Sequence, residues 1–216
     1  MRKTPNPTLP AAWCVKRASS LSDRSSGSSN VARICSFEPT EDRNAEILIL
    51  GSMPGRASLI AGRYYAHARN AFWRIISELL QLDATASYGM RVRALKSARI
   101  ALWDVLHSCS REGSLDSMIE PGSQTANDFP AFFRTHRKIS HVFFNGAKAE
   151  VCFKRHVLRD IDDGSATYAR LPSTSPANAA MSFADKLGAW QVILRPNQPM
   201  PRTVQQRRSA PPLPSR

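Results

Sequence analysis

Four short apolar runs, each followed at once by glycine, proline or polar residues, constrain the fold of this chain more than any other feature. The runs lie in Glu46–Leu50, Arg99–Val105, Ile139–Phe144 and Thr167–Leu171. Short runs that end in such turns are typical of strands buried in a parallel sheet. Segments with helical periodicity separate the runs, so strands and helices alternate along the chain.

The segments between the runs place apolar residues at helical spacing. After the first run, one helix face would carry Phe72, Ile75, Ile76, Leu79 and Leu80. We predict helices at Asn70–Leu80, Tyr88–Ser97, 127–135, Ala147–Leu158 and 182–193, with Asn127 and Ser182 as N-caps. The alternation implies an α/β fold of three layers, α/β/α, with a central four-stranded, mostly parallel sheet and helices on both faces.

The two ends of the chain differ in composition from its middle. Residues 1–34 and 195–216 each carry a net charge of +5, which leaves +3 of the total +13 for residues 35–194. The first segment is rich in serine and the last in proline and arginine, so neither can bury a core. We therefore expect one globular domain, 35–194, between a disordered basic N-terminal extension, 1–34, and a disordered tail, 195–216.

The basic balance favours an anionic partner, usually nucleic acid. The two arms either hold DNA loosely through counterion release or are solvated tails. The four cysteines, at 14, 35, 109 and 152, include no C-x-x-C pair, so we expect no zinc or iron–sulfur site.

The sequence also indicates in which cellular compartment we expect the protein. No apolar run approaches the ~18 residues of a membrane span, and no apolar segment follows Met1–Lys3 as in a signal peptide. We expect an intracellular protein with reduced thiols, cytoplasmic in a bacterium and nuclear or organellar in a eukaryote.

The segments that follow the four strands indicate where a ligand would bind. They are Gly51–Gly55, Asp104–Ser108, Asn145–Gly146 and Pro172–Asn178. Ligands of parallel α/β sheets bind beyond the carboxyl ends of the strands. We therefore expect all four segments to meet at one crevice.

Six short motifs connect this crevice to a known family. They are Leu50–Gly55, Tyr64–Trp73, Ala101–Leu106, Arg111–Asp116, Phe144–Gly146 and Leu171–Asn178. In this order they resemble the mismatch-specific branch of the uracil-DNA glycosylase superfamily, and above all the hypoxanthine-DNA glycosylase (DNA-deoxyinosine glycosylase) family. The resemblance spans about residues 36–194, nearly the whole predicted domain.

The resemblance implies that Asn70 is the catalytic residue. Many superfamily members position the hydrolytic water with an Asp or Asn in the first loop, where this chain has Met53. The family that the chain resembles uses the Asn of Arg-Asn-Ala-Phe-Trp, which is Asn70. From the residues alone, Asn70 can equally cap the helix that begins there, and the two roles can coexist. The family's Pro before Arg-Asn is Ala68 here, which frees one backbone angle.

Five residues are implied to bind the base. Tyr65 matches the aromatic position that stacks on the flipped base, and the alternative is an ordinary core aromatic. Asp104 matches a base-reading position, and a turn or cap role is the alternative. Asn145 touches the base, holds the pocket, or is a left-handed turn residue. Ser52 and Met53 shape the pocket.

The resemblance implies that further residues contact the DNA backbone. By resemblance, Ser173, Thr174, Ser175 and Pro176 form a loop that pinches the backbone. Phosphate contacts are also assigned to Arg69, Arg111 and Ser114, although exposed Arg is usually only solvated. Many relatives begin the loop with a His that stabilises the leaving base, where this chain has Leu171. His67 is the nearest other candidate, and a structural role is its alternative.

The expected activity is hydrolysis of the N-glycosidic bond of a deaminated base in DNA, which leaves an abasic site. Hypoxanthine is the first choice of base, with uracil and xanthine as others. The enzyme would be a monomer and would need no metal or organic cofactor. Because no Lys lies in the motifs, no Schiff-base lyase step is expected, so the enzyme would be monofunctional. A catalytically inactive nucleic-acid-binding protein is the alternative. A small hydrolase of another kind is a third, which the lack of G-x-S-x-G disfavours.

Overall fold

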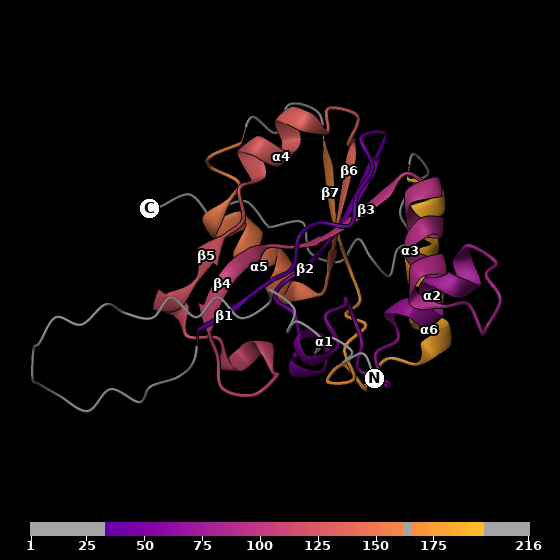
Figure 1. Cartoon of the computed structure of the whole chain (residues 1–216), viewed down its shortest axis with the longest axis horizontal. Helices are drawn as coiled ribbons and strands as arrows, with labels where there is room; N and C mark the ends of the chain where they lie inside the picture. The colour runs from indigo at the N-terminus through magenta and orange to yellow at the C-terminus, as the bar shows by residue number, and fades with distance from the viewer. Residues whose placement is uncertain (1–32, 162–165, 197–216) are drawn as a thin grey trace, which may run out of the picture.

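The computed structural model describes residues 33–161 and 166–196 (Figure 1). Its main sheet has the strand order β3-β2-β6-β7, and all neighbouring strands are parallel. The strands are β2 (Ile47–Gly51), β3 (Ile100–Asp104), β6 (His141–Asn145) and β7 (Thr167–Leu171). The predicted four-stranded parallel sheet is therefore confirmed.

The central strand β2 shows why these runs form a sheet with two covered faces. All five of its residues are buried. Leu48 and Leu50 pack into one hydrophobic cluster, while Ile47 and Ile49 pack into the other. Side chains alternate between the faces of a strand, so an unbroken apolar run requires a helix layer on each side.

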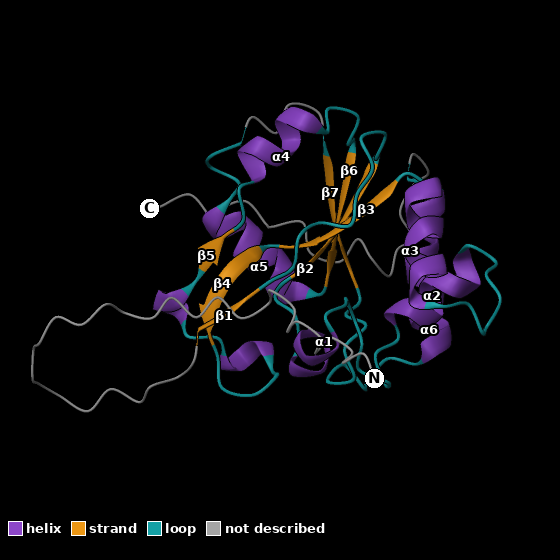
Figure 2. Cartoon of the chain, in the orientation of Figure 1, coloured by secondary structure: helices purple, strands orange, loops and turns teal. Residues whose placement is uncertain are grey.

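The helices supply those two layers (Figure 2). On one face lie α2 (Phe72–Leu79), α3 (Tyr88–Ser97) and α6 (Phe183–Trp190), which share a cluster with Ile47 and Ile49. On the other face lie α4 (Phe129–Thr135) and α5 (Ala147–His156). The three-layer α/β/α arrangement is thus confirmed. None of the helices in the described part of the chain is long and apolar enough to cross a membrane.

A second, smaller sheet was not predicted. It has the order β1-β4-β5 and is antiparallel, with β1 (Arg33–Cys35), β4 (Leu106–Ser110) and β5 (Thr125–Ala126). Strand β4 follows β3 after the single residue Val105. Beyond the crevice the chain therefore runs directly into the second sheet and forms no loop there.

This second sheet also places the start of the domain. Arg33 pairs with Ser110, so the domain includes Arg33 and Ile34, which the prediction assigned to the extension. Residues 1–32 and 197–216, most of the two predicted tails, lie outside the described residues.

The starts of two helices, α4 and α2, differ from the prediction. Asn127 is not the N-cap of α4: Asp128 accepts the capping bond from the Ala131 N–H at 2.9 Å, and Asn127 donates to the Asp104 carbonyl instead. Ser182 caps α6 as predicted. The helix expected from Asn70 begins at Phe72. A short helix after the first loop, α1 (Arg56–Ala61), was not predicted.

Candidate active site

A cleft of about 840 Å³ lies at the carboxyl edge of the main sheet. Its lining includes all of Gly51–Gly55, both Asn145 and Gly146, and all of Pro172–Asn178, as predicted. Of the segment after β3, only Asp104 reaches the cleft, because the chain turns directly into β4. The strand register explains the convergence, since Gly51 lies opposite Asp104 on the neighbouring strand.

Part of the cleft wall comes from outside the four segments that follow the strands of the main sheet. Ser114, Leu115 and Asp116 line it, although they follow β4 and the second sheet. Lys148, near the start of α5, also lines it. The six motifs contain no Lys, and this half-buried lysine reaches the cleft from outside them.

Tyr65 and Tyr64 are neighbours in sequence but lie in different surroundings. Tyr65 has a positive φ of 51°, and its ring stacks on Phe72 with centroids 4.1 Å apart. Tyr64 is a core residue, 3% exposed, whose hydroxyl donates to the Glu38 carbonyl. The Tyr65 hydroxyl is buried and has no hydrogen-bond partner among the described residues. One ring face is therefore supported by Phe72, while the residue itself lines the cleft.

Gly51 brings two functional groups together by having no side chain. A Cβ on Gly51 would lie 2.2 Å from Asp104 Oδ1 and 2.9 Å from the Tyr65 hydroxyl oxygen. Both distances are shorter than Cβ contacts allow. The carboxyl of Asp104 and the hydroxyl of Tyr65 thus occupy the space that any other residue at position 51 would fill.

We expect Gly51→Ala to slow the hydrolysis that the sequence resemblance implies by about 10- to 100-fold, because the added methyl group pushes the Asp104 carboxyl out of its position. The measurement is the single-turnover rate of that reaction. Gly188→Ala is the control, because a Cβ there meets no atom within 4 Å and Gly188 is exposed on α6. Equal rates in both variants would show that the close approach at Gly51 is unimportant.

Asp104 carries a buried carboxyl group, one oxygen of which lacks a partner. Its side chain is 3% exposed, and Oδ2 has no hydrogen-bond partner among the described residues. Burial raises its pKa to about 8, and the nearby Asp116 adds to the increase, while Arg111 opposes it. At neutral pH the carboxyl is therefore protonated and can donate a hydrogen bond.

Asp116 and Ser52 hold the wall beside Asp104. The Ser52 hydroxyl donates to Asp116 Oδ2 at 2.8 Å, which links the first loop to the segment after β4. Burial raises the pKa of Asp116, and the bond from Ser52 opposes this increase. Met53 is 6% exposed and packs into the core while also lining the cleft.

Arg111 is buried and does not lie where a phosphate contact requires it. The side chain is 5% exposed and does not line the cleft. It donates from Nη2 to the Pro54 carbonyl at 2.6 Å and from Nε to the Gly113 carbonyl at 3.2 Å. The predicted phosphate contact is therefore corrected: Arg111 ties the first loop to the turn after β4 and places a buried positive charge near Asp104.

Asn145 holds the pocket through both ends of its amide. Its Nδ2 donates to the Thr174 hydroxyl, and its Oδ1 accepts from the Thr174 N–H, both at 2.9 Å. Asn145 is not among the described residues with positive φ, so the left-handed turn role is wrong. Thr174 is 1% exposed, so the expected contact of its side chain with the DNA backbone is also corrected. This pair fixes the last loop against the end of β6.

Asn70 is not the N-cap of α2, which is Ala71, but its side chain bonds the start of that helix and lines the cleft. Its Oδ1 accepts from the Phe72 N–H at 3.0 Å, which satisfies a free donor at the start of α2. The residue is half-buried and lines the cleft. A carbonyl oxygen has two lone pairs, so the same oxygen can also accept from a water in the cleft.

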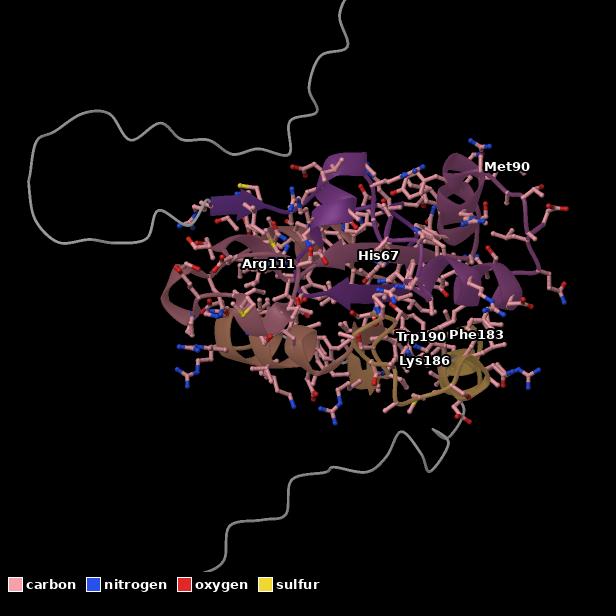
Figure 3. The ribbon with its side chains drawn as sticks, turned by 90° about the horizontal axis from the view of Figure 1, so that it is seen from below. His67, Met90, Arg111, Phe183, Lys186 and Trp190 are labelled. Carbon is pink, nitrogen blue, oxygen red and sulfur yellow. The ribbon has the colours of Figure 1, made fainter. Side chains whose placement is uncertain are left out.

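His67 lies nearby on the exposed rim of the cleft, near the middle of the view in Figure 3. Its Nδ1 accepts from the Arg69 N–H at 3.1 Å, which leaves Nε2 as the donor in the neutral ring. Leu171 is 1% exposed in the core, so the position where many relatives carry a His offers no polar group here.

The remaining predicted contacts line the cleft. They are Arg69, Ser114, Ser173, Ser175 and Pro176. Internal bonds hold the last loop: the Ser173 hydroxyl accepts from the Ser175 N–H, and the Ser175 hydroxyl accepts from the Ala177 N–H, both at 3.2 Å. Further cations on the cleft lining are Arg56, Lys148 and Arg170. The cleft thus combines a buried polar end with several basic residues and the carboxyl group of Asp116.

This fold and cleft match a known class of protein. The chain matches the family model of the uracil DNA glycosylase superfamily over residues 38–194. It therefore belongs to the uracil DNA glycosylase superfamily, and by class it is a DNA glycosylase, a hydrolase of N-glycosidic bonds.

Individual proteins also resemble this chain in sequence or in structure. A hypoxanthine DNA glycosylase of Methanosarcina acetivorans is 36% identical over 160 residues, which cover 74% of this chain and 96% of that protein. One from Methanosarcina barkeri is 39% identical over 114 residues, which cover 52% of this chain and 71% of that protein. The solution NMR structure of a Methanosarcina acetivorans protein, named as a candidate uracil DNA glycosylase, matches with a TM-score of 0.61 at 32% identity, covering 74% of this chain and 98% of that one.

Proposed function

We propose that this glycosylase removes a deaminated base from DNA, with hypoxanthine as its preferred base and uracil and xanthine as weaker substrates. One observation carries the proposal: Asn70, Tyr65, Asp104 and Asn145 line a single cleft whose buried end has two unpartnered polar atoms. The relatives named hypoxanthine DNA glycosylase support the choice of base.

The base would enter the cleft only after leaving the duplex. Extrusion costs a few kcal/mol and is least costly for a mispaired base. Tyr65 would stack on the base with the ring face that Phe72 does not cover. The hydroxyl of Tyr65 and Oδ2 of Asp104, both buried and unpartnered, would then receive the polar edge of the base.

Bond cleavage separates charge between the sugar and the base. Asn70 would hold a water beneath C1′ and orient it for attack as the glycosidic bond breaks. The protonated carboxyl of Asp104 would donate a hydrogen bond to the departing base, whose negative charge grows in the transition state. This assignment supplies a donor in a chain that lacks the His of many relatives.

Base release tests the proposal. Duplexes with a single deoxyinosine, deoxyuridine or deoxyxanthosine are incubated with the protein, and the freed base and the abasic site are measured. We expect deoxyinosine to be cleaved fastest. Binding of all three duplexes without release from any would instead support the inactive DNA-binding alternative.

We also propose that the protein acts as a monomer, because residues of one chain complete the cleft. Light scattering at the concentrations of the activity measurements is the test. A dimer whose dissociation abolishes base release would contradict it.

A further inference from the structure

A second hollow, of about 910 Å³, adjoins the cleft. It lies among the segment Arg63–Asn70, the helix α2 and the first half of α3. The two hollows share Tyr64, Tyr65, His67 and Asn70 in their linings. The segment that carries Asn70 is therefore a ridge with the cleft on one side and the second hollow on the other.

Three arginines line the second hollow: Arg63, Arg74 and Arg91. The one carboxylate among its lining residues is Glu78. None of the three arginines forms an ion pair within the described part of the chain. The second hollow thus carries positive charge that no described side chain neutralises.

Each of these guanidinium groups contacts a neutral group, either an aromatic ring or a backbone carbonyl. Arg63 lies over the ring of Tyr88 at 5.8 Å, and Arg74 lies over Phe183 at 3.8 Å. Arg91 donates from Nη2 to the carbonyl of Ala84. Aromatic faces and carbonyls orient a guanidinium without cancelling its charge, and its remaining donors stay available for an anion.

The second hollow also contains polar atoms without partners. Ser77 is 9% exposed, and its hydroxyl has no hydrogen-bond partner among the described residues. The same holds for Nε of Arg91, which is buried. Buried donors without partners are unfavourable, so a bound group with acceptor oxygens would be stabilised here.

We propose that the second hollow binds the phosphodiester backbone of the DNA strand next to the extruded nucleotide. The inference rests on the proposed function only in taking the cleft as the place of that nucleotide. A sugar held at Asn70 lies on the ridge, so the adjoining phosphates pass over it to the side of the arginines. Phosphate oxygens match guanidinium groups in geometry and charge, and a hydroxyl donor completes the set.

The test is DNA affinity measured by fluorescence anisotropy on the full chain, with a short undamaged duplex at several salt concentrations. Arg63→Gln, Arg74→Gln and Arg91→Gln are each expected to weaken binding by roughly 3- to 10-fold and to make the plot of log K against log salt shallower by about 1. The control is Arg93→Gln, which removes an exposed arginine of α3 that does not line the second hollow. We expect its affinity to stay within about twofold of the unaltered chain.

The outcomes separate this proposal from the proposed function. If no base is released from any duplex but the three variants still weaken binding, the second hollow binds DNA and the activity is wrong. If base is released and the three variants bind like Arg93→Gln, the second hollow is not a DNA site. Should Arg91→Gln unfold, Arg63→Gln and Arg74→Gln decide the question, because both side chains are exposed.

A free phosphate ion presents the same oxygens to the arginines as the DNA backbone does. Inorganic phosphate is therefore added at an ionic strength matched with chloride. We expect phosphate and chloride to displace the duplex equally, because a strand presents several linked phosphates. Displacement by phosphate well beyond that by chloride, lost in Arg91→Gln, would identify a site for the free anion and overturn the backbone assignment.

Discussion

Asn70→Ala is expected to lower the single-turnover rate of base release by roughly 100- to 1,000-fold, the usual cost of removing one group that acts in the transition state. The side chain lines the cleft, and its amide oxygen is the acceptor that would orient the water. Substrate affinity should change little, because that water is not part of the DNA.

The same substitution also removes a hydrogen bond to the start of α2, so stability must be measured beside activity. Asn70 Oδ1 accepts from the Phe72 N–H, and loss of such a bond costs about 1 kcal/mol. Ser182→Ala is the control, because the Ser182 hydroxyl accepts from the Asp185 N–H at the start of α6 and Ser182 does not line the cleft. Equal loss of thermal stability in the two variants, with base release reduced only in Asn70→Ala, is the expected pattern.

A different pattern would reassign Asn70. If Asn70→Ala loses stability as Ser182→Ala does but releases base at the original rate, the Asn70 side chain only stabilises the start of α2. The amide geometry permits that result, because the bond to Phe72 exists whether or not a water is bound.

Base release by the unaltered protein is expected to fall as pH rises through about 8, by about tenfold per unit above the pKa of Asp104. Burial raises the pKa of this carboxyl, and the charge of Asp116 raises it further, against the opposing charge of Arg111. The Tyr65 hydroxyl beside it has a pKa raised by burial, so it stays neutral over this range. Above the pKa, Asp104 becomes an anion that repels the departing base.

Two variants test this assignment through the pH profile. Asp104→Asn keeps the shape and a donor but cannot ionise, so its profile should have no alkaline decline. Asp116→Asn removes a nearby negative charge, which lowers the pKa of Asp104 and moves the decline to lower pH. An unchanged decline in Asp104→Asn would assign it to another group.

The stability of the folded protein should also depend on the protonation of Asp104. The pKa of Asp104 is about 8 in the folded protein and about 4 when unfolded, so the folded state holds the extra proton between these values. The stability contributed by Asp104 is therefore complete below pH 4 and is lost as pH rises towards 8. Asp104→Asn should gain thermal stability relative to the unaltered chain over this range, as measured by melting at pH 5 and pH 8.

Much of the fold and of the cleft followed from the sequence because local patterns specify them. Apolar runs with two buried faces indicated the parallel sheet, and chain order placed Gly51, Asp104 and Asn145 at its carboxyl edge. The resemblance to the glycosylases added the expectation for Asn70. The short strands of the second sheet carry too few apolar residues for such a pattern, so they were missed.

Only the tertiary structure decided what surrounds each side chain. Nothing in the pattern of Arg111 or Thr174 distinguishes a buried residue from a DNA contact, and packing between distant segments buries both. Asp116 comes to the cleft because Ser52 binds it from 64 residues away. The sequence therefore determined which strands end at the cleft, whereas long-range packing determined the charge state of Asp104 there, because a pKa depends on burial and on neighbours that chain order does not reveal.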